Sequence, residues 1–188
     1  MAQIGSYTLD VASGRWTSSR GLDAILGIDA TYERSVEGWA SLIHSHDRDA
    51  MLAYFAGDVV GRHGRFDRQY RIVRADTREE RWVHGRGVLD LDRTGRPVRM
   101  VGTIADITDQ RVLEARNRRL AQALVQTSEA VLITGPAGEF EFANPAFERL
   151  SGLTQQDLRG QTMGSLAGEI PVPTLADVSR TLTEGGPW

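Results

Sequence analysis

The sequence predicts an α+β protein in which short helices pack against an antiparallel sheet. Three segments alternate apolar and polar residues and are separated by turns, which is typical of antiparallel strands; they cover residues 66–72, 81–91 and 97–104. A short hairpin and several helical segments with one apolar face come before them. Helices grouped ahead of consecutive strands favour an α+β arrangement over a parallel sheet with alternating helices.

The composition is that of an ordinary globular protein, and it excludes several kinds of chemistry. Of the 188 residues, 40% are hydrophobic and 25% are charged, with a net charge of −3. The absence of cysteine excludes disulfide scaffolds, thiolate metal sites and cysteine nucleophiles. All 22 basic residues are arginine, which excludes Schiff-base chemistry and a P-loop lysine. We expect a cytoplasmic protein, or part of one, that neither binds nucleic acid nor spans a membrane.

The first third of the chain predicts a hairpin followed by short helices. Residues 4–11 carry the hydrophobic residues Ile4, Tyr7, Leu9 and Val11, and a glycine turn leads into residues 15–17. Ser19 precedes a short one-sided helix that stops at Gly27. Residues 35–57 fit two further amphipathic helices, and we expect the second to end at Gly57.

Two glycines, Gly85 and Gly87, fall on the expected inner face of the second long strand. They either leave a cavity for a small ligand or make room for Trp16 or Phe55. Because protein interiors are close-packed, filling is the favoured interpretation. If a cavity exists, its expected lining residues are Trp16, Phe55, Val83, Gly85 and Ile104.

Residues 108–128 predict a connector helix. Thr108 suits the N-cap, and Asp109 falls in the first turn, where negative charge stabilises a helix start. Five residues then follow the alternating four- and three-residue spacing of a coiled-coil seam, and they are Leu113, Asn117, Leu120, Leu124 and Thr127. The seam is short, so the alternative is a helix that packs on its own domain.

The opening pattern repeats after this helix. Gly14 and Gly27 have counterparts in Gly138 and Gly152, at offsets of 124 and 125 residues. We therefore expect one domain at 1–107 and the N-terminal part of a second at 129–188, because nothing in the second copy matches residues 66–107. Half a sheet cannot cover a core, so we expect low stability and exposed aromatic side chains there. These side chains are Phe140, Phe142 and Phe147.

Several motifs then occur in a characteristic order. Trp39 is followed at residues 44–48 by His-Ser-His-Asp-Arg, and residues 81–83 read Arg-Trp-Val. Residues 101–108 read Val-Gly-Thr-Ile-Ala-Asp-Ile-Thr, and residues 142–147 read Phe-Ala-Asn-Pro-Ala-Phe. In this order and spacing the motifs resemble two PAS domains in tandem, the first with its C-terminal PAC segment. The chain departs from the family at Ser45 and His46, where Pro and Asp are usual, and at residues 76–79, where Asp-Gly is usual.

This resemblance implies a non-catalytic sensory and dimerisation module of a larger bacterial signalling protein. The implied output is a sensor histidine kinase, with a cyclic-di-GMP cyclase or phosphodiesterase as the alternative. The implied partners are a second copy, a downstream output domain and a small-molecule ligand; the copies would meet through the helix and PAS surfaces, including an outward-facing Trp82. A signal would pass from the sheet into the connector helix. The transmitting residues would be Asp106, Ile107, Thr108, Leu113, Asn117, Leu120 and Leu124.

The sequence contains no recognisable set of catalytic or metal-binding residues. We therefore expect no enzymatic activity, no metal and no cofactor as the leading interpretation. His44 and His46 are two residues apart and cannot share the helix face that a metal pair uses. Light-sensing members of the family that the chain resembles carry a cysteine and a glutamine, and here Ile104 stands at the glutamine position. The alternative is a self-standing redox sensor, with haem on His46 or His63 or with flavin near Asn144 in the second domain.

Overall fold

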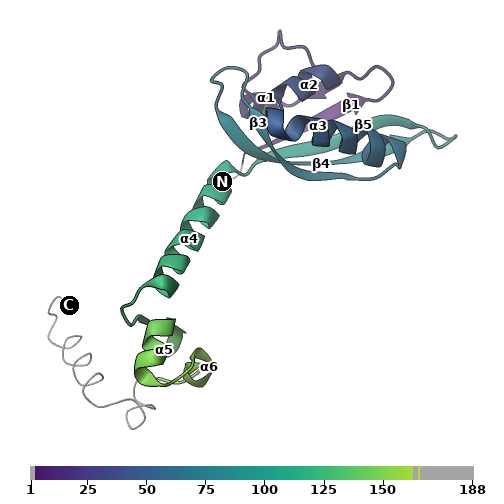
Figure 1. Cartoon of the computed structure of the whole chain (residues 1–188). Helices are drawn as coiled ribbons and strands as arrows, with labels where there is room; N and C mark the ends of the chain where they lie inside the picture. Colours follow the sequence, from purple (N-terminus) through teal and green to yellow (C-terminus); the bar gives the residue numbers. More distant parts are fainter. Residues whose placement is uncertain (1–2, 163–164, 166–188) are drawn as a thin grey trace. The chain divides into compact units, whose positions relative to one another are not determined.

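The computed structural model describes residues 3–162 and residue 165. The chain divides into two compact units, Met1–Glu114 and Ala115–Trp188. In the first unit, helices lie along one face of a five-stranded sheet (Figure 1). Its strands are β1 (Ile4–Asp10), β2 (Trp16–Ser18), β3 (Phe66–Val73), β4 (Glu80–Leu91) and β5 (Pro97–Asp106). Its helical segments are α1 (Arg20–Leu26), α2 (Val36–Leu42), α3 (Ser45–Tyr54) and the π-helical η1 (Phe55–Gly61).

The sheet is antiparallel throughout and has the order β2-β1-β5-β4-β3. β1, the first strand of this sheet in the sequence, pairs along its whole length with β5, which is the last strand of this sheet. β3 lies at one edge, where it pairs with β4 over its entire length. The α+β class predicted from the sequence is confirmed, with the hairpin and the three long strands as expected.

Local signals position most of the helix ends. The Ser19 hydroxyl accepts a hydrogen bond from the backbone N–H of Leu22, and Gly27 ends α1 in the left-handed conformation at φ 67°. The predicted helix end at Gly57 is wrong. Phe55 keeps a right-handed helical conformation (φ −61°, ψ −50°), and the chain continues through η1 to Gly61. A glycine favours a helix end where the backbone turns left-handed, and Gly57 has no positive φ.

Side chains from the inner sheet face and from the helices form the core of the first unit. Ile25, Ile72 and Val83 are completely buried. Helix α1 approaches β1 so closely that a Cβ on Gly5 would clash with the backbone of Leu22. This close approach requires a glycine and brings α1 directly onto the sheet.

The space above Gly85 is filled by an aromatic ring from the neighbouring strand. A Cβ built on Gly85 would lie 2.6 Å from the ring of Phe66. The expectation that Trp16 or Phe55 takes this space is therefore wrong. Gly85 pairs with Arg68 on β3, and paired residues face the same side of the sheet. Phe66 lies two residues before Arg68, so its side chain projects from that same side.

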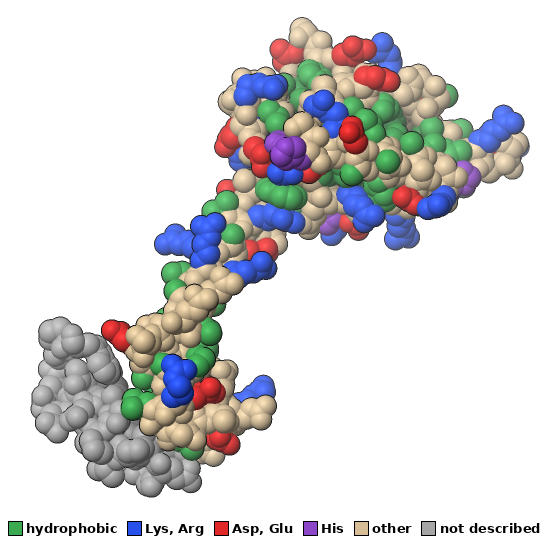
Figure 2. Space-filling model, in the orientation of Figure 1, with side chains coloured by type: hydrophobic (Ala, Val, Ile, Leu, Met, Phe, Trp, Pro, Cys, Tyr) green, Lys and Arg blue, Asp and Glu red, His purple; other side chains and the backbone are tan. Residues whose placement is uncertain are grey.

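The helix α4 (Thr108–Gln126) begins in the first unit and continues into the second. It contains no buried residue, and Leu113 and Leu120 are 58% and 56% exposed. Figure 2 shows hydrophobic and arginine side chains together on its surface. No helix in the described part of the chain is both long and apolar enough to cross a membrane.

The second unit contains the hairpin β6 (Leu132–Thr134) and β7 (Phe140–Ala143), followed by α5 (Pro145–Ser151) and α6 (Gln155–Leu158). Phe140 and Phe147 are 6% and 8% exposed, so the expectation that they are exposed is wrong. They pack with Ala143 and Leu158, because α6 supplies an apolar side chain against the hairpin. Phe142 is half-buried.

The internal repeat is visible in the backbone of both units. Gly14 and Gly138 take left-handed conformations at φ 66° and 82° in equivalent hairpin turns. Gly27 and Gly152 end equivalent helices, at φ 67° and 77°. Each pair occupies positions where glycine has little steric cost, so the repeated glycines mark repeated geometry.

Candidate functional site

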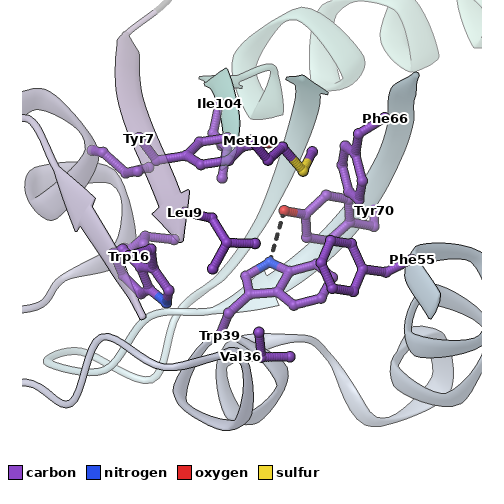
Figure 3. A pocket seen from close by; sticks show the side chains of 12 residues that line it. Tyr7, Leu9, Trp16, Val36, Trp39, Phe55, Phe66, Tyr70, Met100 and Ile104 are labelled. Atoms are coloured by element: carbon purple, nitrogen blue, oxygen red, sulfur yellow. Dashed lines mark hydrogen bonds between the residues drawn. The ribbon is translucent and has the colours of Figure 1, made fainter. Parts of the chain in front are cut away.

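A cavity of about 50 Å³ lies between the sheet and the helices of the first unit (Figure 3). This volume is several times what one water molecule requires. Four strands line one side, and α1, α2 and η1 line the other; none of the lining side chains is charged. The wall consists of Tyr7, Leu9, Trp16, Leu22, Leu26, Val36, Trp39, Phe55, Phe66, Tyr70, Met100 and Ile104.

Few polar groups interrupt this apolar wall. The Trp39 indole N–H donates a hydrogen bond to the Tyr70 hydroxyl at 3.1 Å, drawn as the dashed line in Figure 3. The Trp16 indole N–H donates to the backbone carbonyl of Ser35 at 2.8 Å. No hydrogen bond is found for the Tyr7 hydroxyl among the described residues. The Tyr7 hydroxyl, which packs over Gly87, and the hydroxyl hydrogen of Tyr70 are therefore the groups of the wall left to bind a polar atom of a ligand.

Burial keeps both wall tyrosines in their neutral form. Desolvation raises the pKa of Tyr70 to about 12, although the hydrogen bond from Trp39 partly opposes this shift. Desolvation also raises the pKa of Tyr7, with a smaller contribution from Tyr70. A neutral phenol can donate or accept a hydrogen bond, so the cavity favours an uncharged partner.

The cavity brings together part of the lining set proposed from the sequence. Trp16, Phe55 and Ile104 lie in the wall. Val83 is completely buried in β4 but lies outside the wall. Gly85 lies under an aromatic ring rather than on the cavity.

Three wall residues with polar atoms were not proposed from the sequence. Tyr7 lies on the inner face of β1 between Gly5 and Leu9, and period-two alternation could have placed it there. Trp39 and Tyr70 are 31 residues apart, and no local pattern predicts their hydrogen bond.

The residues of the first unit do not fit a haem or a flavin. No histidine lines the cavity, and both His46 and His63 are exposed. A flavin ring requires several hydrogen-bonding partners, and ligands of that size occupy pockets of about 300–1,000 Å³. The cavity offers two tyrosine hydroxyls with hydrogen-bonding capacity left, those of Tyr7 and Tyr70, and a much smaller volume.

The remaining histidine candidate has a local structural role. His44 is the N-cap of α3, and its Nδ1 accepts a hydrogen bond from the backbone N–H of His46 at 3.2 Å. Its Nε2 lies 3.3 Å from a carboxylate oxygen of Glu80. Among the described residues, no cluster of three or more acidic, histidine or cysteine side chains could hold a metal ion.

Hydrogen bonds fix the junction between β5 and α4. The Asp106 carboxylate accepts from the Thr108 backbone N–H at 2.9 Å and from its hydroxyl at 2.6 Å. The Thr108 hydroxyl accepts from the backbone N–H of Trp82 at 3.0 Å, and the backbone N–H of Ile107 donates to the Trp82 carbonyl at 2.9 Å. Arg81 lies 3.5 Å from the other Asp106 oxygen. The last strand, its neighbour β4 and the first turn of α4 are therefore joined directly.

The proposed seam residues differ in their surroundings. Leu113, Asn117 and Leu120 are exposed, and Leu124 is half-buried. The backbone carbonyl of Leu124 accepts a hydrogen bond from Asn144 in the second unit. The first three residues are therefore accessible to a second chain.

Asn144 uses its whole side-chain amide within the second unit. It is fully buried, and its oxygen accepts from the backbone N–H groups of Val131 and Phe147 at 2.8 and 2.9 Å. Its nitrogen donates to the carbonyls of Leu124 and Glu129 at 3.0 and 2.8 Å. These four bonds cap α5 and hold the end of α4 beside β6, so the amide does not fit a flavin ligand.

Comparisons with known proteins agree with this geometry. One family model, described as the PAS fold, matches residues 15–104, and a second, described as a PAS domain, matches residues 118–184. The chain carries two PAS domains in tandem. The sensor protein FixL of Bradyrhizobium diazoefficiens is 24% identical over 170 residues, which cover 88% of this chain and 33% of FixL. The chain thus spans about a third of the length of that relative.

Two solved structures resemble this tandem PAS chain. A sensory box histidine kinase/response regulator from Burkholderia thailandensis is 26% identical, covers 67% of this chain and 93% of its own, and gives a TM-score of 0.54. The N-terminal domain of a diguanylate cyclase with a PAS/PAC sensor from Marinobacter aquaeolei is 17% identical. It covers 57% of this chain and 98% of its own, with a TM-score of 0.53, and supports the fold alone. These two structures support the PAS fold of the chain.

Proposed function

We propose that this tandem PAS chain is a non-catalytic, cytoplasmic input module of a larger signal-transduction protein, and that a sensor histidine kinase is its output. The similarity to FixL extends across both PAS domains, and the Burkholderia relative is a histidine kinase. A cyclic-di-nucleotide enzyme is the alternative output. PAS domains themselves supply sensing rather than catalysis, and we expect no turnover of ATP or GTP by this chain.

The continuity of β5 with α4 carries this proposal. Ile104 lies in the cavity wall, and Asp106, two residues further along the same strand, binds Thr108 at the helix start. A change in how the cavity is filled would displace β5 and would alter the hydrogen bonds at the junction. The backbone of Trp82 would transfer the same displacement from β4. The cavity is thus the site that receives the signal, and α4 is the element that carries it onward.

The chemistry of the wall determines the class of ligand. An apolar surface with no charged side chain would leave an ionised ligand unpaired, at a large cost in free energy. A small, uncharged, mainly apolar molecule with one hydrogen-bonding group suits the space, and that group would pair with the Tyr7 hydroxyl. Displacement of a few poorly hydrogen-bonded water molecules would favour binding.

Thermal unfolding with three probes of equal size tests this assignment. A six-membered ring fills a cavity of roughly 150 Å³, so the wall must widen when either aromatic probe binds. Phenol should raise the unfolding temperature of the first PAS domain more than benzene, because phenol can bind the Tyr7 hydroxyl. Benzoate should have no effect, since its charge cannot be buried there. In the Tyr7→Phe variant, phenol should lose its advantage over benzene. An equal response to benzoate and phenol, or a flavin or haem absorption spectrum in the purified protein, would contradict the proposed ligand class.

Dimerisation through α4 completes the proposed mechanism. Leu113, Asn117 and Leu120 follow coiled-coil spacing and are exposed, so a second copy can bury them. A displaced β5 would rotate the start of each helix against its partner. The downstream output domain would respond to this change in helix register.

A further inference from the structure

The ring of Trp82 lies on the outer face of the sheet, between two arginines. The guanidinium carbon of Arg111, on α4, lies 3.9 Å from the centre of the Trp82 ring. The guanidinium carbon of Arg71, on β3, lies 5.6 Å from it. Trp82 was expected to face outward and to add to a dimer contact; it is half-buried, and its ring is in contact with Arg111 of the helix. Cation–π contacts of this kind attract Arg111, and with it α4, to the sheet.

Arg111 also binds the edge strand. Its Nη2 donates a hydrogen bond to Oε1 of Gln69 on β3 at 2.6 Å. Thr108 and Arg111 are three residues apart and lie on the same side of α4. Thr108 binds the backbone of Trp82, and Arg111 stacks on its ring. The two contacts therefore fix both the position of the helix start and its rotation about its own axis.

β3 connects this outer contact with the cavity. Successive side chains of a strand point to opposite faces. Tyr70 lies in the cavity wall, and its two neighbours, Gln69 and Arg71, lie on the outer face. Because β3 is an edge strand, it is held by a strand ladder on one side only. A shift of Tyr70 thus moves Gln69 and Arg71 with it.

Arg71 joins helix α3 to the same set of contacts. Its guanidinium donates to both Asp47 carboxylate oxygens, at 2.6 and 3.0 Å, and its backbone N–H donates to one of them at 3.0 Å. Asp47 lies in the first turn of α3, and Phe55 of the cavity wall follows the end of that helix. A bidentate carboxylate–arginine pair has a defined geometry and can transfer a displacement.

We propose that β3 forms a second route from the cavity to α4, in which Gln69 and the Trp82 ring hold Arg111 and thereby set the rotation of the helix. This route differs from the Asp106–Thr108 junction because it uses the edge strand and side chains on the outer face, and the two meet at Trp82. Arg111 is a positioning residue in this arrangement. The role of this route in signalling rests on the proposed function. The mechanical coupling of the cavity to α4 through β3 does not.

Hydrogen exchange of the whole chain tests the contact itself. Arg111→Ala should speed exchange of the amides at 111–114 about tenfold, because it removes both a stacked cation and a charge-assisted hydrogen bond. Arg111→Lys should speed it only about threefold, since an ammonium keeps the charge but loses the planar stack. Arg116→Ala, an exposed arginine further along the same helix, is the matched control and should change exchange less than about twofold.

A double-mutant cycle tests the route. Tyr70→Phe removes the Trp39 hydrogen bond inside the cavity, and we expect it to change exchange at 111–114. If β3 carries the effect, the change should be at least about threefold smaller in the Arg111→Ala background. If the changes in exchange rate caused by Tyr70→Phe and Arg111→Ala simply multiply in the double variant, the second route is overturned. Unaltered exchange at 111–114 in Arg111→Ala would overturn it as well. No ligand is needed, so failure of phenol to bind would count against the proposed function and leave this result intact.

Discussion

At the level of single residues, Tyr70 connects the cavity with protein stability. Its side chain is 2% exposed, and its hydroxyl accepts the Trp39 indole N–H. Burial favours the neutral phenol, which raises the pKa of Tyr70 in the folded state to about 12 from its ordinary value of 10.0. The folded state therefore binds its proton more tightly than the unfolded state does.

This difference predicts how stability changes at alkaline pH. A raised pKa in the folded state contributes stability that is fully present below pH 10.0 and is lost as the pH rises towards about 12. Tyr70→Phe should remove much of this alkaline slope, and at neutral pH it should cost about 1–2 kcal/mol through the lost hydrogen bond. Urea unfolding from pH 7 to 11 measures both quantities.

One further test variant and one control variant make the alkaline experiment decisive. Tyr7→Phe should also reduce the slope, because burial raises the pKa of Tyr7 as well. Tyr32 lies outside the cavity wall, so Tyr32→Phe is the control. The loss of alkaline slope caused by Tyr70→Phe should be the same with and without Tyr32→Phe. A slope that is identical in the wild type and in Tyr70→Phe would show that Tyr70 ionises freely in the folded protein.

At the level of elements, the predictable features were those with local causes. Ser19 and Gly27 determine α1, and Asn144 with Pro145 begins α5, because caps act within a few residues. The extension of the third helical region into a π-helix past Gly57 was not predictable from such signals. Period-two patterning located the three long strands, since it depends only on neighbouring positions.

Features that depend on distant residues escaped prediction. The contact of Arg111 with Trp82 and Gln69 joins residues up to 42 positions apart, and no sequence spacing encodes it. Trp82 was expected on the outer face and lies there, but its partner could be found only once α4 was placed. The cavity was likewise predicted only in part, because its wall combines four strands with three helical segments.

The exposed face of α4 leads to a prediction about assembly. Leu120→Glu would place a charge at the centre of the proposed seam, and burial of an unpaired carboxylate is unfavourable. We expect this variant to sediment as a monomer, at concentrations where the parent is a dimer, while the first PAS domain stays folded. Arg118→Glu alters charge on the same helix away from the seam and should preserve the dimer.

Asn117 gives a second test of the same element. A polar residue at a seam position reduces affinity but fixes register. Asn117→Leu should therefore strengthen association and allow helices to pair in more than one register, which disulfide trapping at introduced cysteines would detect. A dimeric Leu120→Glu protein would mean that α4 does not form the interface.

At the level of the whole molecule, the two PAS units differ in how much structure covers their cores. The first has a five-stranded sheet and a core of more than a dozen buried side chains. In the described part of the second, a two-stranded hairpin packs with α5 and α6 around Phe140, Ala143, Phe147 and Leu158. A two-stranded hairpin is marginally stable alone, so this unit depends on its small helices and on Asn144.

Hydrogen exchange should therefore separate the two units. We expect amides of β4 and β5 to exchange at least about 100-fold more slowly than those of β6, β7 and α5, because local opening costs less where fewer apolar contacts are lost. Asn144→Ala should widen this gap, since it leaves four backbone groups, of which the N–H of Phe147 is buried, without their partners and frees the end of α4. Gln122→Ala, which removes an exposed side-chain amide on α4 outside the proposed seam, is the matched control. Equal protection in both units would show that the second PAS unit is as stable as the first despite its smaller described core.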